Sequence, residues 1–386
     1  MHRRTAIIAL GATLHVATGF SAAAQPLRIG VSLGITGQYT ATSMMQRRAY
    51  EMWRDETNAR GGILGRPVDL SIVDDGSDAG RAIAIYTDFV ARQGMDFVFA
   101  PYSSELTGSV APIVEAAGFP TLAPGASADE IWQKGYRNIF GLLTTASRYS
   151  QGMMRLAHDA GLSSIAVIAA TDRFSAGAAE GTVKWAPYLQ LKVVHDARLA
   201  AGGDDAEAAL RAARQAGAEL VVVAGHLDDA VAARLALKAM AWEPRAFYAT
   251  IGPALPEYRA KVGDLNDGTF STSLWEPLKS SDFPGANEFA SRFHARFGVD
   301  PSYQAATAYA AGQILESAIT AAGGTDRNRV RDAISALDTY SILGRFAVDH
   351  TGMQVKRFEM IIQWQEGHKE IVWPEAVRSA KPVFGA

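Results

Sequence analysis

The sequence predicts an α/β protein made of two doubly wound lobes, each with a parallel β-sheet between layers of helices. Three observations predict this fold. Short apolar runs alternate with helical patterns along the chain, and this order produces parallel sheets covered on both faces. The alternation restarts after residue 150, so there are enough units for two lobes. The run at 220–223 (LVVV) is entirely apolar, as expected for a strand buried on both faces.

The first half of the chain shows the alternation clearly. A strand at 27–33 leads through a Gly/Thr-rich loop to a helix at 43–60, whose apolar residues recur on one face. Ser43 is the expected N-cap, and Gly61-Gly62 ends the helix because glycine readily takes the left-handed conformation. The elements expected next are strands at 68–73, 97–100 and 120–123, and helices at 79–93 and 107–117.

The second half repeats the pattern and then changes. We expect strands at 165–169, 193–197, 220–224 and 247–250, with clear helices at 207–215 and 228–240. The C-terminal third has strands at 268–275, 345–348, 358–363 and 371–373, and helices at 287–297, 303–322 and 327–337. These are too few for a third parallel sheet, so they complete the two lobes. We expect an N-terminal lobe of 25–146 and 277–350, and a C-terminal lobe of 147–276 and 351–386.

Residues 1–24 have the pattern of a secretory signal peptide. A short basic region, MHRR, precedes an apolar stretch at 5–20, and Ala22-Ala23-Ala24 fits the small-x-small cleavage rule. The stretch is short for a membrane span, which needs about 20 apolar residues; the alternative is a buried N-terminal helix. Arg3-Arg4 hints at twin-arginine export, although its flanking pattern is poor. Cleavage after Ala24 would place the mature protein in the periplasm.

The composition excludes several classes of protein. The chain has no cysteine, which removes disulfides, thiolate catalysis, cysteine zinc sites and the thiol of a lipid anchor. The formal net charge of −3 is unfavourable for binding nucleic acid or an anionic membrane. We expect a monomer.

No enzyme motif is present. The chain has no glycine-rich phosphate loop, no G-x-S-x-G elbow and no closely spaced pair of histidines. Asp74-Asp75 is interpreted as turn chemistry before Gly76, and Asp228-Asp229 as the charged first turn of a helix. We therefore expect no catalytic residue, metal or cofactor.

Two loops rich in hydroxyl groups follow expected strands. Tyr102-Ser103-Ser104 follows the third strand, and Pro124-Gly125-Ala126-Ser127 follows the fourth. Ligands of open α/β sheets bind at the carboxyl ends of strands, where helix N-termini attract anions. The two loops would together hold one carboxylate; the alternative is that they form two ordinary helix N-caps.

At these residues the chain resembles the type I periplasmic substrate-binding proteins of ABC importers, in the branched-chain amino acid (leucine/isoleucine/valine-binding) group. The segment at 58–67 (NARGGILGRP) is the most specific part of the resemblance. The other matching pieces are Ile29-Gly30-Val31 with Thr36-Gly37, Asp74-Asp75, Ser103-Ser104, 120–127, 297–301 (FGVDP) and 308–311 (AYAA). The resemblance implies two lobes joined by three strands, which close on a small molecule and deliver it to a membrane permease without catalysis.

The resemblance also implies a set of site residues. Ser103 and Ser104 match positions that bind a ligand carboxylate, with Ala126 and Ser127 beside them. Phe174 matches a position that is usually tyrosine on the closing lobe. Thr42, with Ser43, falls near a residue of the first loop that lines the cleft.

Two departures from the family pattern bear on the ligand. Amino-acid binders of the family place a glutamate against the ligand ammonium, and the corresponding residue here is Ile251. A second position, often aspartate, falls within 147–150, which reads Ser-Arg-Tyr-Ser. An ammonium buried without a counter-ion costs several kcal/mol. The lost acid and the gained Arg148 both favour an anionic ligand without an amine.

We therefore hypothesise that the ligand is a carboxylate without an α-amino group. An aromatic or aryl-alkanoic acid is preferred, because Tyr102, Tyr149 and Phe174 would line the cleft; a branched 2-oxo acid is a further option. His226, at another strand end, is a candidate contact. The alternative roles are a surface or hinge salt bridge for Arg148 and ordinary packing for Tyr149 and Phe174.

Three rival functions remain. A branched-chain or other hydrophobic amino acid binder is the nearest alternative. A ligand-sensing partner of a signalling receptor would use the same fold. An exported hydrolase would need a nucleophile and a base, and the sequence shows no such pair.

Overall fold

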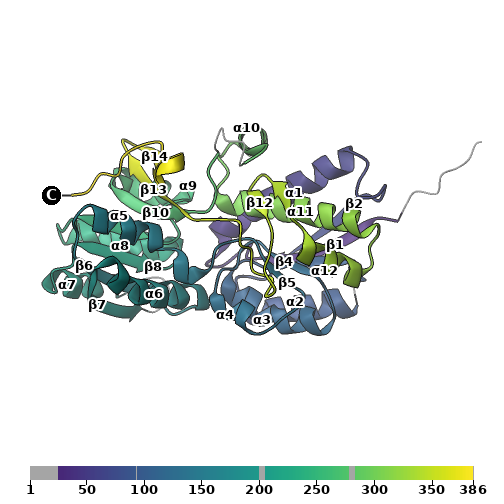
Figure 1. Cartoon of the computed structure of the whole chain (residues 1–386), viewed down its shortest axis with the longest axis horizontal. Coiled ribbons are helices and arrows are strands. Elements are labelled where there is room, and N and C mark those ends of the chain that lie inside the picture. Colours follow the sequence, from purple (N-terminus) through teal and green to yellow (C-terminus); the bar gives the residue numbers. More distant parts are fainter. Residues whose placement is uncertain (1–24, 93, 200–204, 278–282, 386) are drawn as a thin grey trace, which may run out of the picture.

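A computed structural model describes residues 25–92, 94–199, 205–277 and 283–385. They form two lobes that lie side by side along the long axis of the molecule (Figure 1), and each lobe has its own β-sheet. This confirms the predicted α/β architecture. The predicted signal peptide, residues 1–24, lies outside the described residues. Within the described residues, no helix is long and apolar enough to cross a bilayer.

The N-terminal lobe is built on a parallel sheet of five strands in the order β2-β1-β3-β4-β5. Its strands are β1 (Leu27–Leu33), β2 (Val68–Asp74), β3 (Phe97–Phe99), β4 (Thr121–Ala123) and β5 (Ile139–Gly141). Its first helices are α1 (Thr40–Ala59), α2 (Ala79–Ala91), α3 (Ser104–Ala116) and α4 (Asp129–Gln133). The order reverses between β1 and β3, the point at which open α/β sheets bind ligands.

The C-terminal lobe is built on a sheet of seven strands in the order β14-β13-β10-β9-β8-β6-β7. Five of them are parallel and repeat the order of the first sheet, with the reversal between β6 and β8. They are β6 (Ser164–Ala170), β7 (Lys192–Leu199), β8 (Leu220–Ala224), β9 (Ala246–Ala249) and β10 (Thr269–Ser273). The helices are η1 (Ala146–Arg148), α5 (Gln151–Asp159), α6 (Arg173–Trp185), η2 (Ala186–Leu189), α7 (Ala206–Gln215), α8 (Leu227–Ala239), α9 (Pro256–Val262) and η3 (Gly263–Asn266).

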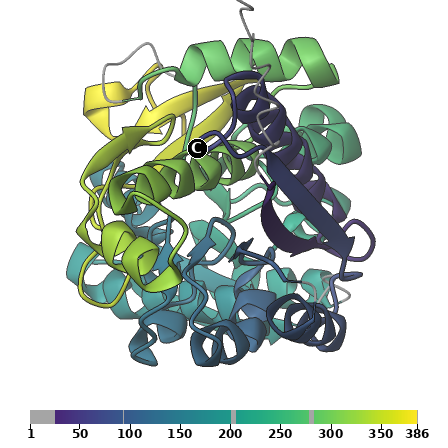
Figure 2. The same ribbon diagram turned by 90° about the vertical axis from the view of Figure 1, so that its right-hand side faces the viewer.

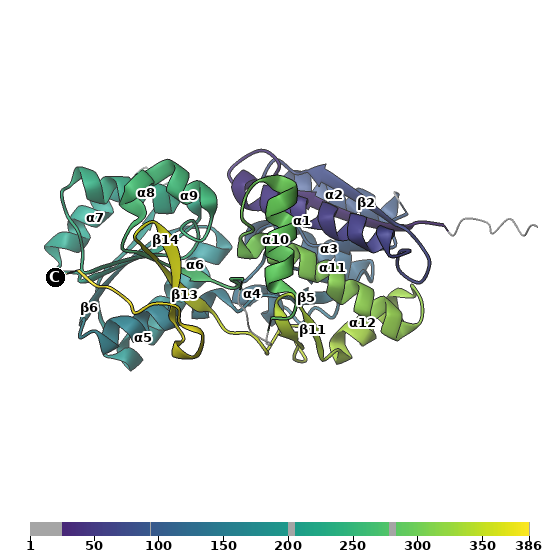
Figure 3. The same ribbon diagram turned by 90° about the horizontal axis from the view of Figure 1, so that it is seen from above.

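The C-terminal third is shared between the two lobes, as predicted (Figure 3). The N-terminal lobe gains three helices and a two-stranded ribbon: α10 (Ala286–Phe297), α11 (Tyr303–Ala322), α12 (Arg327–Ala336), β11 (Thr339–Ser341) and β12 (Gly344–Phe346). The C-terminal lobe gains β13 (Met360–Gln365), β14 (His368–Trp373) and η4 (Glu375–Val377).

The pairing of β13 and β14 departs from the predicted parallel sheet. Both strands run antiparallel to their neighbours. A two-residue turn joins them, in which Glu366 and Gly367 have φ angles of 51° and 76°. Positive φ at both positions is typical of the tight turn of a β-hairpin, and a hairpin is antiparallel by construction.

The chain crosses between the lobes three times. The described parts of these crossings, 142–145, 274–277 and 355–359, have no regular strand, although the resemblance implies three strands. Trp275 is buried in the second crossing, and its Nε1 donates to the Ile342 carbonyl at 3.0 Å. The exact residue limits of the two lobes stay a prediction.

Helix α1 begins three residues earlier than predicted. Tyr39 is its N-cap, and Ser43 lies inside the first turn. The Ser43 hydroxyl instead accepts a hydrogen bond from Gly34 N at 3.1 Å, so it holds the loop after β1. The predicted end is confirmed, because Gly61 and Gly62 have φ angles of 96° and 77°.

The packing of α1 against α11 forms the core of the N-terminal lobe (Figure 2). The helices approach most closely where Trp53 lies over Gly312. A Cβ atom on residue 312 would lie 2.2 Å from Cδ2 of the Trp53 ring, so only glycine fits there.

We predict that Gly312→Ala destabilises the protein by about 1–3 kcal/mol, because the added methyl group overpacks a buried interface. Chemical denaturation followed by circular dichroism measures the effect. Gly324→Ala is the control, since no atom lies within 4 Å of a Cβ at that position. Equal stability of the two variants would contradict the prediction.

Candidate functional site

One enclosed cavity lies where the loops after the parallel strands of both lobes meet. In this closed arrangement its volume is only about 10 Å³, roughly the room for one water molecule. Eight of the eleven residues predicted from the sequence line it: Tyr102, Ser103, Ser104, Ser127, Tyr149, Phe174, His226 and Ile251. The cavity therefore occupies the carboxyl edges of both sheets, where the strand order predicts a ligand.

Hydroxyl groups line the side of the cavity that belongs to the N-terminal lobe. The Ser104 hydroxyl accepts hydrogen bonds from Ser127 N and Ala128 N at 2.9 and 3.0 Å. It thereby ties the two predicted loops together and keeps its own proton for a ligand oxygen. The Ser103 hydroxyl is buried and lies close enough to the Tyr39 hydroxyl to interact with it. Among the described residues, it makes no hydrogen bond of ordinary geometry.

Aromatic side chains join this polar wall to the C-terminal lobe. The Tyr149 hydroxyl lies 3.0 Å from the Ser127 hydroxyl. The Tyr149 ring meets Phe174 edge to face, with centroids 5.0 Å apart. Its carbonyl accepts hydrogen bonds from Tyr248 and Thr272 at 3.1 and 2.7 Å. Tyr149 is therefore held firmly at the end of the first crossing.

His226 and Asp172 form a charged pair on the C-terminal side. His226 Nε2 lies 3.3 Å from Asp172 Oδ1. Burial alone would lower the pKa of His226, but the negative charge of Asp172 raises it above its ordinary value. Burial likewise opposes ionisation of Asp172, yet the pKa of its carboxyl is lowered because the charge and hydrogen bond of His226 dominate.

The same histidine contacts the opposite lobe. Its ring lies 5.0 Å from the Tyr39 ring and 6.4 Å from the Tyr102 ring, measured between centroids. Phe174, on its own lobe, is 5.6 Å away. His226 therefore belongs to the group of rings that brings the two lobes together.

Three predicted residues do not line the cavity. Thr42 is buried behind Tyr102 and donates to the Tyr39 carbonyl at 2.9 Å. Ala126 is buried between two lining residues of its loop. Arg148 is exposed. Its positive charge partly offsets the rise that burial causes in the pKa of the Glu359 carboxyl, at the end of the third crossing. The hinge role considered for Arg148 fits this position better than a ligand contact.

Sequence reasoning missed three lining residues: Gly125, Leu143 and Tyr303. Gly125 was within a predicted loop, but glycine has no side chain to suggest a contact. Leu143 lies in the first crossing, and Tyr303 is the first residue of α11, far away in sequence. No local pattern distinguishes either of them from core residues.

Asp74 and the two acids of α8 have the structural roles predicted. Asp74 Oδ1 accepts hydrogen bonds from Gly76 N and Thr36 N at 2.9 and 3.1 Å, which is turn chemistry. Asp228 and Asp229 lie in the first turn of α8, where a negative charge favours the helix.

The comparisons with known proteins agree with this architecture. Residues 26–369 match the family model described as periplasmic binding protein. The chain belongs to this family. Its resemblance to the branched-chain amino acid group of type I proteins is also confirmed, and the family consists of binding proteins and not of enzymes.

Three relatives illustrate the range of the family. The "Leu/Ile/Val-binding protein homolog 8" of Brucella suis is 26% identical, and the match covers 99% of both chains. The substrate-binding protein LivJ of Streptococcus pneumoniae, solved with isoleucine, has a TM-score of 0.81 at 19% identity and covers 91% of this chain and 100% of its own. A solute-binding protein of R. palustris, solved with benzoate, has a TM-score of 0.80 at 19% identity, with 94% and 99% covered. The fold alone therefore does not distinguish amino acids from aromatic acids.

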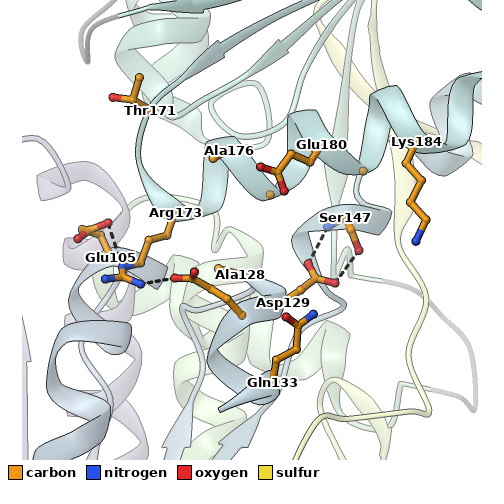
Figure 4. Close-up of a pocket in the computed structure, with 13 residues that line it drawn as sticks. Glu105, Ala128, Asp129, Gln133, Ser147, Thr171, Arg173, Ala176, Glu180 and Lys184 are labelled. Atoms are coloured by element: carbon orange, nitrogen blue, oxygen red, sulfur yellow. Dashed lines mark hydrogen bonds and ion pairs between the residues drawn. The ribbon is translucent and has the colours of Figure 1, made fainter.

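This periplasmic binding protein also has ion pairs across the mouth of the cleft. A groove of about 530 Å³ separates α6 from α3 and α4. Figure 4 shows Arg173, at the start of α6, pointing towards Glu105 and Glu130 of the opposite lobe. The Arg173–Glu105 pair spans 3.4 Å, and Arg173 also bonds Glu130. We call this group the Arg173 latch.

We predict that Arg173→Gln shifts the protein without ligand towards an open form, because both ion pairs of the Arg173 latch join opposite lobes. Exposed pairs are worth about 0.2–1 kcal/mol each, so loss of both should raise the open population by about twofold to thirtyfold. Small-angle X-ray scattering would show a larger radius of gyration. Arg155→Gln is the control, because Arg155 pairs with Asp159 inside α5. Identical scattering from both variants would contradict the role of the latch.

We predict that wild-type protein loses more stability between pH 6 and pH 9 than His226→Asn does. The pKa of His226 is raised in the folded state, so its contribution is complete below the unfolded value of about 6.5 and disappears as pH rises through the folded value. The charges of Asp172, Asp229 and Asp228 all act on the imidazole. Thermal unfolding at both pH values measures the difference, with exposed His368→Asn as the control. Parallel profiles of stability against pH for wild type and His226→Asn would contradict the predicted contribution of His226.

Proposed function

We propose that this protein captures a small carboxylate without an α-amino group and delivers it to an ABC permease of the inner membrane. An aromatic or aryl-alkanoic acid is the preferred ligand class. One observation supports this most strongly: no acidic side chain is among the residues that line the cavity. An ammonium enclosed there would meet no carboxylate in the cavity wall, and the neighbouring Asp172 is already paired with His226. Burial of an unpaired charge is costly.

The charges around the cavity favour an anion. His226 is the one lining residue that becomes positively charged, and Asp172, which pairs with it, does not line the cavity. The hydroxyl groups of Ser103 and Ser104 are available as neutral donors, beside the mutually bonded hydroxyls of Ser127 and Tyr149. A carboxylate would be held by these donors, and closure would strengthen the hydrogen bonds by excluding water.

The other side of the cavity suits an apolar body. Phe174 and Ile251 come from the C-terminal lobe, and Leu143 comes from the first crossing. Ile251 occupies the position where the family pattern has a glutamate for the amine, so an apolar group replaces a counter-ion. Aromatic ligands would extend the edge-to-face contacts already made by Tyr149 and Phe174.

The mechanism proposed is closure of the two lobes around the ligand. Each lobe contributes half of the cavity wall, so a ligand that contacts both halves favours the closed form. We propose that the protein acts as a monomer in the periplasm. Binding of leucine, isoleucine or valine is the second candidate, because relatives of full length are named for these amino acids.

A thermal-shift screen of refolded protein without ligand separates the two candidates. We expect stabilisation by benzoate derivatives, phenylpropanoates or branched 2-oxo acids, and none by leucine, valine or phenylalanine. A ligand at 100 times its Kd should stabilise the protein by about 2.7 kcal/mol. Stabilisation by leucine or valine, without any by the acids, would replace the proposed function with branched-chain amino acid binding.

A further inference from the structure

Two buried glutamines lie behind the wall of the cavity. Gln46 comes from α1 and Gln304 from α11, and their exposed fractions are 0% and 1%. Among the described residues, no hydrogen bond of ordinary geometry reaches Nε2 or Oε1 of either side chain, although the Gln304 amide lies close enough to the Tyr102 hydroxyl to interact with it. A primary amide has two donors and a carbonyl acceptor, so this region holds a large unused capacity for hydrogen bonds.

Both amides are separated from the cavity only by residues that line it. Gln304 lies beside the Tyr102 hydroxyl and directly follows Tyr303. A Cβ atom on residue 125 would lie 3.1 Å from Gln46 Nε2 and 2.7 Å from Cδ2 of Tyr102. Because residue 125 is glycine, its backbone packs directly against the Tyr102 ring and the Gln46 amide.

Ordinary packing does not explain these two amides. A buried polar group without a partner costs about 1–3 kcal/mol, and most buried polar groups in proteins are satisfied. Apolar side chains of similar length would fill the same space without this cost. Two such residues on neighbouring helices, both next to cavity residues, indicate a polar partner that enters from the cavity.

We propose that Gln46 and Gln304 form a polar subsite of the ligand cavity and read a neutral hydrogen-bonding group of the ligand. This inference rests on the proposed function and narrows its ligand class. The ligand is then a carboxylic acid with a hydroxyl or carbonyl group on its apolar body, for example a hydroxylated aromatic acid. Tyr102 and Gly125 lie between the main cavity and the Gln46 amide.

The test compares pairs of acids that differ by one hydroxyl group. Isothermal titration calorimetry of the purified protein would measure benzoate against 3- and 4-hydroxybenzoate, and 3-phenylpropanoate against its 4-hydroxyphenyl counterpart. Gln46→Met and Gln304→Met remove the amides and keep the length of the side chain. Gln215→Met, at the exposed end of α7, is the control.

We expect wild-type protein and the control to prefer a hydroxylated acid by about tenfold or more, because a site built for a hydroxyl rejects the analogue without it. At least one methionine variant should lose this preference and keep its affinity for the unsubstituted acid. An equal affinity of wild-type protein for both members of every pair would overturn the subsite and leave the proposed function intact. A preference for the hydroxylated acid that survives in both methionine variants would also overturn the subsite. It would mean that buried water, and not the ligand, satisfies the amides. If one methionine variant fails to fold, the other variant still tests whether the amides cause the preference.

Failure of the proposed function gives a different result. If only amino acids bind, the preference between threonine and valine, which differ by a hydroxyl in place of a methyl group, tests the same amides. A threonine preference that Gln46→Met or Gln304→Met abolishes supports the subsite, and its absence overturns it. Failure of every probe to bind would overturn both proposals.

Discussion

The binding cavity depends on one constraint, the meeting of two parallel sheets at their carboxyl edges. In a parallel sheet every βα loop emerges at the same edge, so residues far apart in sequence are brought together without a long loop. Ser103 follows β3, Phe174 follows β6 and His226 follows β8. Each side chain is attached to a stiff sheet, and the freedom that remains is mainly that of one lobe relative to the other. Binding and closure are therefore coupled by the architecture itself.

The placement of charge follows from the low polarity of this closed interior. Within the described residues, the ionised groups nearest the cavity are paired, as Asp172 is with His226, because an isolated buried charge is too costly. The Arg173 latch lies at the partly exposed groove, where its ion pairs remain in contact with water. We therefore expect the interior to select a ligand by hydrogen bonds and shape, and the outer ion pairs to affect the balance between open and closed forms.

Buried polar atoms without partners are the most informative feature of the N-terminal lobe. The Ser103 hydroxyl and the amides of Gln46 and Gln304 all adjoin residues of the cavity. A stable core would avoid them, since each lost hydrogen bond weakens the folded state. The loss of stability is offset when a ligand forms hydrogen bonds with these atoms. A site with such atoms also distinguishes between closely similar molecules. Local stability and recognition therefore make opposite demands on the same few side chains.

The sequence alone determined the helices and strands, because periodic burial leaves a direct trace in the order of residues: β8 (Leu220–Ala224) and α11 (Tyr303–Ala322) have the predicted limits. It also indicated the hydroxyl loops, since strand ends are visible locally. Only the tertiary structure decided which neighbours point inward. In the turn that starts with η1, Tyr149 faces the cavity and Arg148 faces solvent, and Leu143 and Tyr303 meet across about 160 residues of chain. Side-chain direction in an irregular crossing, and contacts between distant segments, depend on the packing of whole lobes, which no local pattern of residues encodes.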